Sequence, residues 1–166
     1  MIRRATTDDA AALAALGAAT FTETFGHLYP PEDLQTFLAT HSVEAWDGVL
    51  RDARSAVWIA ELEDAAAAGY IVVGACKLPV ENCEPTAGEV KQLYVLSQHH
   101  KLRLGTRLME RGLEWLEAQQ RDPIYIGVWS ENFGAQRFYA RYGFSKVGDY
   151  GFRVGNTVDH EFILKR

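Results

Sequence analysis

Apolar residues recur along this chain with two different periods. Leu13 and Leu16 near the N-terminus, and Leu104 and Leu108 further on, follow the spacing of an amphipathic helix. The run 55–63 is instead mostly apolar and includes β-branched and aromatic residues, as in a strand. The full pattern predicts, in order, a strand at 2–6, a helix to about Phe25, helices starting at Pro31 and after Ser42, strands at 55–63, 69–80 and 89–96, a helix after residue 101, a strand at 124–129, a helix at about 132–142, and two strands joined by Gly155-Asn156. This order predicts an α/β fold with a mixed sheet.

Helix-start residues support these positions. Thr7 is expected to cap the first helix, with Asp8 and Asp9 in its first turn. Pro31 suits the first position of the second helix, and Ser42 suits the cap of the third. The first three helices are therefore expected to begin at defined points.

Length and composition indicate an ordinary globular protein. The chain has 166 residues, which predicts a single domain, residues 1–166, with a substantial core. No apolar run approaches the ~20 residues that span a bilayer, and Asp8 and Asp9 interrupt the one stretch that resembles a signal peptide. We therefore expect a cytoplasmic protein with no membrane partner, in which Cys76 and Cys83 are reduced thiols.

The net charge and the absence of metal-ligand motifs limit the classes of binding partner that we expect. The net charge of −5 disfavours general nucleic-acid binding and suits a small cationic substrate. No spacing typical of zinc ligands is present, so no metal is expected.

A basic entrance precedes one predicted helix. Lys101, Arg103 and Arg107 lie at its front end, where the helix dipole disfavours cations. Gly105 permits close approach to the backbone and Thr106 adds a hydroxyl donor, so a bound pyrophosphate would explain the cations. A solvated basic helix start is the alternative interpretation.

The segment 131–144 carries a second pattern. Asn132 is a good helix cap, and Gly143 suits a helix end with positive φ. Tyr139 follows Phe138 in an apolar stripe where leucine would also pack, although a buried hydroxyl needs a partner. On these residues alone, Tyr139 is either a core residue or a catalytic one.

Together the two patterns resemble the GNAT superfamily of acyl-CoA-dependent N-acetyltransferases over nearly the whole chain. The resemblance rests on the IRRATTDDA opening, the LYVL strand with the helix after it, and NFGAQRFYARYGF, which has the form N-x-x-A-x-x-F-Y-x-x-x-G-F. Within the superfamily, TFTETFGHLYPPEDLQTFL, GVWSENFGAQRFY and DHEFILK are most similar to bacterial spermidine/spermine N-acetyltransferases of the PaiA type. The phosphate loop departs from the family form Q/R-x-x-G-x-G/A, because it reads HKLRLG and only Gly105 matches. The resemblance implies a mostly antiparallel central sheet flanked by helices on both faces.

The resemblance also implies acetyl-CoA as cosubstrate. Pantetheine would pair with the strand backbone, where the amide of Val95 or a neighbour would polarise the thioester carbonyl. Pyrophosphate would lie on the first amides of the following helix. The implied cofactor-binding residues are Leu93, Tyr94, Val95, Lys101, Arg103, Leu104, Gly105, Thr106 and Asn132.

The implied reaction is direct attack of a primary amine on the thioester. Tyr139, by its motif position, would protonate the departing thiolate. Glu89 is expected to share a strand face with Lys91 and Leu93 and to act as the base through water. A solvent-exposed acid at the strand end is the alternative interpretation of Glu89.

Substrate contacts are expected between the first two helices and at a strand end. Glu23, Tyr29 and Trp129 would hold a polyamine or another small cationic amine. Glu32 and Asp33 are interpreted as helix-start acids, and Glu131 is a further pocket candidate.

Three functions stay open from the sequence. The first is acetylation of a small cationic amine, and the second is acetylation of a peptide or protein amine. The third is a non-catalytic acyl-CoA-binding or regulatory domain, which the altered phosphate loop permits. The oligomeric state is open too, a homodimer included.

Overall fold

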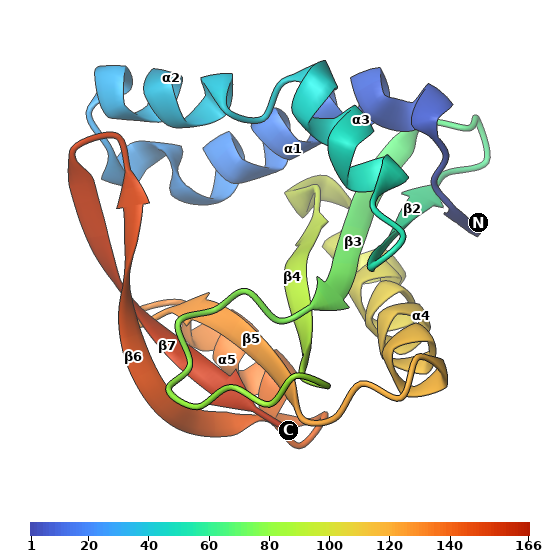
Figure 1. The fold of residues 1–166 in the computed structure, drawn as a ribbon. Helices are drawn as coiled ribbons and strands as arrows, with labels where there is room; N and C mark the ends of the chain where they lie inside the picture. Colours follow the sequence, from blue (N-terminus) through green and yellow to red (C-terminus); the bar gives the residue numbers. More distant parts are fainter.

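The computed structural model describes residues 1–166 and contains one seven-stranded sheet with helices on both faces (Figure 1). The strands are β1 (Ile2–Arg4), β2 (Ser55–Glu61), β3 (Ala67–Ala75), β4 (Gly88–Val95), β5 (Ile124–Trp129), β6 (Ser145–Val154) and β7 (Thr157–Lys165). The helices are α1 (Ala10–Phe25), α2 (Pro31–Ala39), α3 (Val43–Arg51), α4 (Leu104–Ala118) and α5 (Phe133–Ala140), with short 3-10 segments η1 (Thr7–Asp9), η2 (Gly26–Leu28) and η3 (Ser97–Leu102). The predicted α/β fold, with a mostly antiparallel sheet between helices, is confirmed.

The helix starts follow the sequence with one correction. The Ser42 hydroxyl accepts a hydrogen bond from the Ala45 amide at 3.3 Å, and Pro31 occupies the first turn of α2, as predicted. Thr7 is not the cap of α1, because the chain first forms η1 and α1 begins at Ala10. Thr6 caps η1, and its amide donates to the Asp9 carboxylate at 2.8 Å, while Asp9 itself occupies the N-cap position of α1.

The two faces of the sheet have separate cores. On one face, side chains of α4, including Leu108, Met109 and Leu116, are fully buried against β3, β4 and β5. On the other face, α1 and α3 pack Leu13 and Trp46 against the opposite sides of β2 and β3. Removing these surfaces from water is the main force that holds the helices on the sheet.

The sheet divides between its two central strands. Its order is β1-β2-β3-β4-β5-β7-β6, and only β4 and β5 run parallel. Their pairing lasts for three residues and ends at Val90 opposite Ile126. Beyond this point the strands diverge (Figure 1), so the backbone groups on their facing edges have no strand partner, although β4 stays paired with β3 and β5 with β7.

A β-bulge changes the alternation of side chains along β4. Val73 pairs with Val90 but Val72 pairs with Gln92, so Lys91 is the extra residue. Val90 and Leu93 consequently contact the same core on the α4 face. The expectation that Glu89 shares a face with Leu93 is therefore wrong, although Glu89 and Lys91 do meet.

The β6–β7 hairpin reaches back to α2 (Figure 1). Gly155 and Asn156 form its turn, as predicted, and the Asp33 carboxylate accepts hydrogen bonds from the Asn156 amide at 2.9 Å and the Thr157 hydroxyl at 2.7 Å. Asp33 is thus more than a helix-start acid, because it fixes the hairpin over the end of the sheet.

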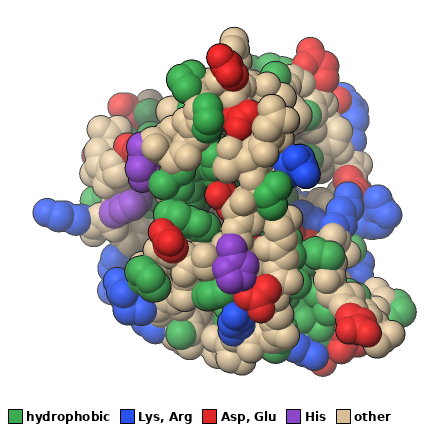
Figure 2. Space-filling model, turned by 90° about the vertical axis from the view of Figure 1, so that its left-hand side faces the viewer, with side chains coloured by type: hydrophobic (Ala, Val, Ile, Leu, Met, Phe, Trp, Pro, Cys, Tyr) green, Lys and Arg blue, Asp and Glu red, His purple; other side chains and the backbone are tan.

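The surface around this hairpin carries mixed charge. Figure 2 shows acidic, basic and histidine side chains scattered among hydrophobic ones, with no single basic patch on this face. None of the helices combines the length and apolar character required to cross a bilayer.

Candidate active site

The divergence of β4 and β5 opens a cavity of about 970 Å³. Its walls come from the end of α1, both central strands, the start of α4, α5 and the β6–β7 hairpin. Sheet backbone, a helix N-terminus and acidic side chains therefore face one common space. Of the residues predicted for the site, the cavity is lined by Tyr29, Glu89, Leu93, Tyr94, Val95, Arg103, Gly105, Thr106, Trp129, Asn132 and Tyr139.

The start of α4 offers free backbone donors to the cavity. The helical ladder begins with the Arg107 amide donating to the Arg103 carbonyl, so the amides of residues 104–106 have no partner within the helix. Gly105 lies close to Val95, because a Cβ placed on this glycine would be 3.9 Å from Val95 Cγ2. The amides and the edge of β4 thus form one continuous surface that suits an anion followed by an extended chain.

Arg103, which stands where the family form has a glycine, has a backbone conformation that favours glycine. Its φ of 55° and ψ of 23° are left-handed, and it caps α4 without a side-chain hydrogen bond. Lys101 is exposed in η3 and does not line the cavity, while the Leu104 side chain is buried in the core, so that only its amide is available.

Along the open edge of β4, the backbone groups of every second residue face the cavity. The Leu96 amide donates to Ala68, and every second residue of an antiparallel ladder bonds to the same neighbour. The backbone of Tyr94 therefore faces β3, whereas the groups of Leu93 and Val95 face the cavity. The Val95 carbonyl is already bound to His100 Nε2 at 2.9 Å, which leaves its amide as the available group.

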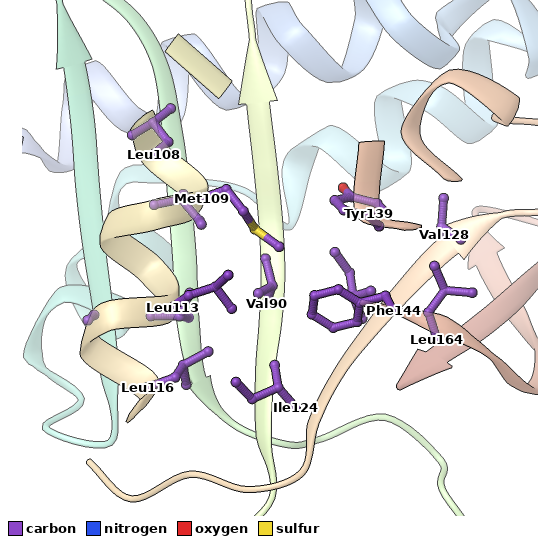
Figure 3. Close-up of a cluster of buried hydrophobic side chains, with 14 of the residues drawn as sticks. Val90, Leu108, Met109, Leu113, Leu116, Ile124, Val128, Tyr139, Phe144 and Leu164 are labelled. Atoms are coloured by element: carbon purple, nitrogen blue, oxygen red, sulfur yellow. The ribbon is translucent and has the colours of Figure 1, made fainter. Parts of the chain in front are cut away.

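Tyr139 lies at the margin of the core on the α4 face (Figure 3). Its ring is 8% exposed and packs with Phe138 and Phe144, and Figure 3 shows its oxygen turned away from the apolar cluster. The hydroxyl has no hydrogen-bond partner in the protein. Its oxygen is not completely buried, so it is open to the cavity that Tyr139 lines. Burial raises the pKa of Tyr139 above its usual range, which keeps the phenol protonated and able to donate.

Glu89 faces the opposite side of the sheet from Tyr139. Its Oε2 accepts from the Lys77 amide at 2.7 Å and from Lys91 Nζ at 3.1 Å. These bonds connect the loop after β3 to β4. Glu89 is 8% exposed, so the interpretation as a solvent-exposed strand-end acid is wrong.

Two further acids on β7 face the cavity and were not recognised from the sequence. Asp159 accepts a hydrogen bond from the Tyr29 hydroxyl, and Glu161 accepts one from the Tyr150 hydroxyl. Burial raises the pKa of Glu161, nearby Asp159 raises it further, and the Tyr150 hydrogen bond acts in the opposite direction. The spacing of these acids, two residues apart in a strand, was the signal that they share a face.

The predicted substrate residues separate into two groups. Tyr29 and Trp129 line the cavity, and Phe25 contacts Trp129 edge-on with ring centroids 6.1 Å apart. Glu23 does not line it, because its carboxylate accepts bonds from the Ser97 amide and hydroxyl at 2.9 and 2.6 Å. Glu131 is exposed outside the cavity wall. Glu23 therefore has a structural role, because it connects α1 to the turn after β4.

Asn132 performs the capping role predicted for it. Its Oδ1 accepts from the Ala135 amide at 3.1 Å, and the side chain also lines the cavity. Gly143 has the predicted positive φ, at 86°. The local structure of this second sequence pattern is confirmed.

Comparison with known proteins identifies the family. Residues 17–144 match the acetyltransferase (GNAT) family. Because the match covers more than half of the chain, the chain belongs to the GNAT acetyltransferases. An uncharacterised N-acetyltransferase from the pepI 3′ region of Lactobacillus delbrueckii subsp. lactis is 27% identical over 157 residues, 92% of this chain and 88% of that protein. Another from Mycobacterium tuberculosis is 28% identical over 159 residues, 95% of this chain and 97% of that one.

Solved structures share the fold at lower identity. The PaiA N-acetyltransferase of Thermoplasma acidophilum, solved with coenzyme A, has a TM-score of 0.79 at 15% identity and covers 100% of this chain and 97% of its own. A ribosomal-protein-alanine N-acetyltransferase of Brucella melitensis has a TM-score of 0.68 at 21% identity, with 100% and 98% covered. The superfamily prediction is confirmed, and the PaiA subfamily stays a prediction.

Proposed function

We propose that this GNAT acetyltransferase moves an acetyl group from acetyl-CoA to a primary amine of a small cationic molecule in the cytoplasm, a polyamine being the substrate class that we favour. One observation carries the proposal. A single cavity joins the free amides of α4 to a chamber that contains Glu89, Asp159 and Glu161.

The donor side of the cavity suits acetyl-CoA. The amides of Leu104, Gly105 and Thr106 would hold the pyrophosphate, with Arg103 as counter-charge. Lys101 lies outside the cavity wall and would add only its positive charge from the neighbouring η3. The bound donor would supply an activated thioester carbonyl, toward which the Val95 amide can donate. The PaiA structure with coenzyme A supports this assignment by analogy of fold.

The acceptor side suits a cation. Asp159 and Glu161, which have no cation partner in the protein, line it together with the aromatic rings of Phe25 and Trp129. Both kinds of group attract ammonium. An extended polyamine could place one ammonium at the thioester while another contacts Asp159.

The direct test follows thiol release from acetyl-CoA with a panel of amines: spermidine, a short diamine, a monoamine, amino acids and peptides with a free N-terminus. We expect the polyamines to give the highest kcat/KM. Fastest release with peptides would instead support the peptide-amine alternative. Coenzyme A binding without release for any amine would indicate a non-catalytic module.

Replacing Arg103 by glycine tests the unusual phosphate loop. The left-handed conformation costs a non-glycine residue on the order of 1 kcal/mol, and the greater freedom of unfolded glycine offsets about 0.5–1 kcal/mol. We therefore expect an unchanged or slightly higher melting temperature, whereas loss of an exposed cation should weaken coenzyme A binding roughly twofold to fivefold. Arg103→Ala is the control, since it should lose the same affinity and be less stable than Arg103→Gly. Unaltered affinity in both variants would remove Arg103 from the donor site.

Replacing Asp159 by asparagine tests the acceptor site. Asparagine can still accept the Tyr29 hydrogen bond but carries no charge. We expect kcat/KM for spermidine to fall roughly tenfold, as for a half-buried ion pair, and kcat/KM for a monoamine to change less. Equal losses for both amines would mean that Asp159 does not hold a second ammonium.

A further inference from the structure

We propose that Glu161, rather than Glu89, is the general base that deprotonates the attacking amine. This inference rests on the proposed function, because it identifies the base of that same acetyl transfer. Glu161 lies on β7 opposite Trp129 of β5 and Tyr150 of β6, and it lines the cavity where β4 and β5 diverge.

Its position relative to Tyr139 fits an acid–base pair. Leu164 and Phe162 of β7 contact the α4-side core, so Glu161 projects from the other face of the sheet. Tyr139 belongs to that α4-side core. The acid and the base thus approach the opening between β4 and β5 from opposite faces, and the thioester can lie between them.

One oxygen of Glu161 is free to accept a proton. The Tyr150 hydroxyl donates to Oε2. Oε1 accepts no hydrogen bond from the protein and is not completely buried. No lysine or arginine pairs with Glu161, whereas Glu89 is held by the Lys91 ammonium and the Lys77 amide. Glu161 and Asp159 are therefore both oriented by a tyrosine hydroxyl and unpaired with a cation. Of these two, Glu161 is the carboxylate whose charge acts on Tyr139, so it lies on the side of the chamber nearer the acid.

Lys77 and Lys91 line the same cavity, where Lys91 pairs with Glu89. The titratable groups whose charges interact with Glu161 are one acid and four phenols. They are Tyr150 of β6, Asp159 of β7, Tyr139 of α5, Tyr94 of β4 and Tyr29 between η2 and α2. Burial and the Asp159 charge raise the pKa of Glu161, which makes the carboxylate a better proton acceptor near neutral pH. An alkyl ammonium with a pKa near ~10.4 needs such an acceptor before its nitrogen can attack.

The bonds and protons of the acetyl transfer can be followed step by step. Glu161 takes one proton from the ammonium, and the freed lone pair forms the C–N bond to the carbonyl carbon. As the C–S bond breaks, Tyr139 gives its proton to the departing sulfur. The nitrogen still carries one proton more than the neutral amide, and the Tyr139 phenolate takes that proton. Glu161 releases its proton to solvent, so one proton is liberated per acetyl group transferred.

The test compares Glu161→Gln with Glu89→Gln in the pH dependence of kcat/KM, using the panel amine that wild type acetylates fastest. Wild type should rise with pH to a plateau set by its base. Glu161→Gln should fall roughly 10²–10⁴-fold at neutral pH and lose the plateau, rising continuously as more amine is deprotonated in solution. Glu89→Gln should keep the plateau. Calorimetry with coenzyme A and the melting temperature establish that each variant is folded.

A second variant tests the same assignment without removing the carboxylate. Tyr150→Phe deletes a hydrogen bond to ionised Glu161, so the acidic limb should move to higher pH. A plateau should still be reached, at a lower kcat/KM, because the carboxylate is present but less well oriented. The inference is overturned if Glu161→Gln keeps the plateau, if Glu89→Gln alone loses it, or if Tyr150→Phe leaves the limb in place. If wild type binds coenzyme A but acetylates no amine, the proposed function itself fails and the inference with it.

Discussion

Tyr139→Phe is expected to lower kcat by roughly 10²–10⁴-fold while leaving coenzyme A affinity almost unchanged. The ring contacts with Phe138 and Phe144 remain in the variant, so the core on the α4 face keeps its packing. What is lost is a hydroxyl that is open to the cavity and protonated at every pH of interest, because burial raises the pKa of Tyr139. Without this proton donor, sulfur must leave as an unprotonated thiolate. Steady-state kinetics and calorimetry measure the two quantities separately.

Tyr142→Phe is the matched control for this prediction. Tyr142 follows α5, packs against the same core and does not line the cavity. Its kcat should stay within about twofold of wild type, as expected for a conservative change away from the reacting atoms. Equal loss of kcat and coenzyme A affinity in Tyr139→Phe would show that Tyr139 only packs.

Most of the fold follows from local sequence signals. The caps at Ser42 and Asn132, the Gly155-Asn156 turn and the positive φ at Gly143 all act over a few residues, so their sequence patterns specify their structure. The bulge at Lys91 was not predictable in this way. It depends on how β3 and β4 align over their whole length, and it reverses the alternation on which the face of Leu93 was inferred.

The donor side of the site is easier to predict than the acceptor side. Gly105 and Thr106 belong to one contiguous strand–turn–helix unit, whose geometry is local. The acceptor chamber instead joins the end of α1 to β7, and these segments are distant in sequence. Glu161 escapes a sequence-based prediction because an acid within a strand has no local signature of catalysis. The charge of Glu23 suggests a substrate contact, but its proximity to Ser97 gives it a structural partner.

Gly127→Ala is expected to lower kcat by about 10²-fold, far more than its effect on stability would suggest. A Cβ at residue 127 would overlap the Tyr150 hydroxyl and lie 3.1 Å from Tyr150 Cζ and 3.3 Å from Glu161 Oε2. The tip of a tyrosine can move to relieve this overlap, so the free energy of unfolding should fall by no more than about 1–3 kcal/mol. The movement, however, withdraws the hydrogen bond that orients Glu161.

A double-mutant cycle separates displacement from simple overpacking. Tyr150→Phe removes the atom that the new methyl group would strike, so Gly127→Ala in that background should lower kcat much less than it does in wild type. Additive losses would mean that the methyl group acts on the backbone of β5 and not through Tyr150. Strong non-additivity would instead show that a glycine in β5 keeps open the space in which Tyr150 orients the β7 carboxylate. In that case the acceptor site requires the absence of a side chain at residue 127 as well as the acid itself.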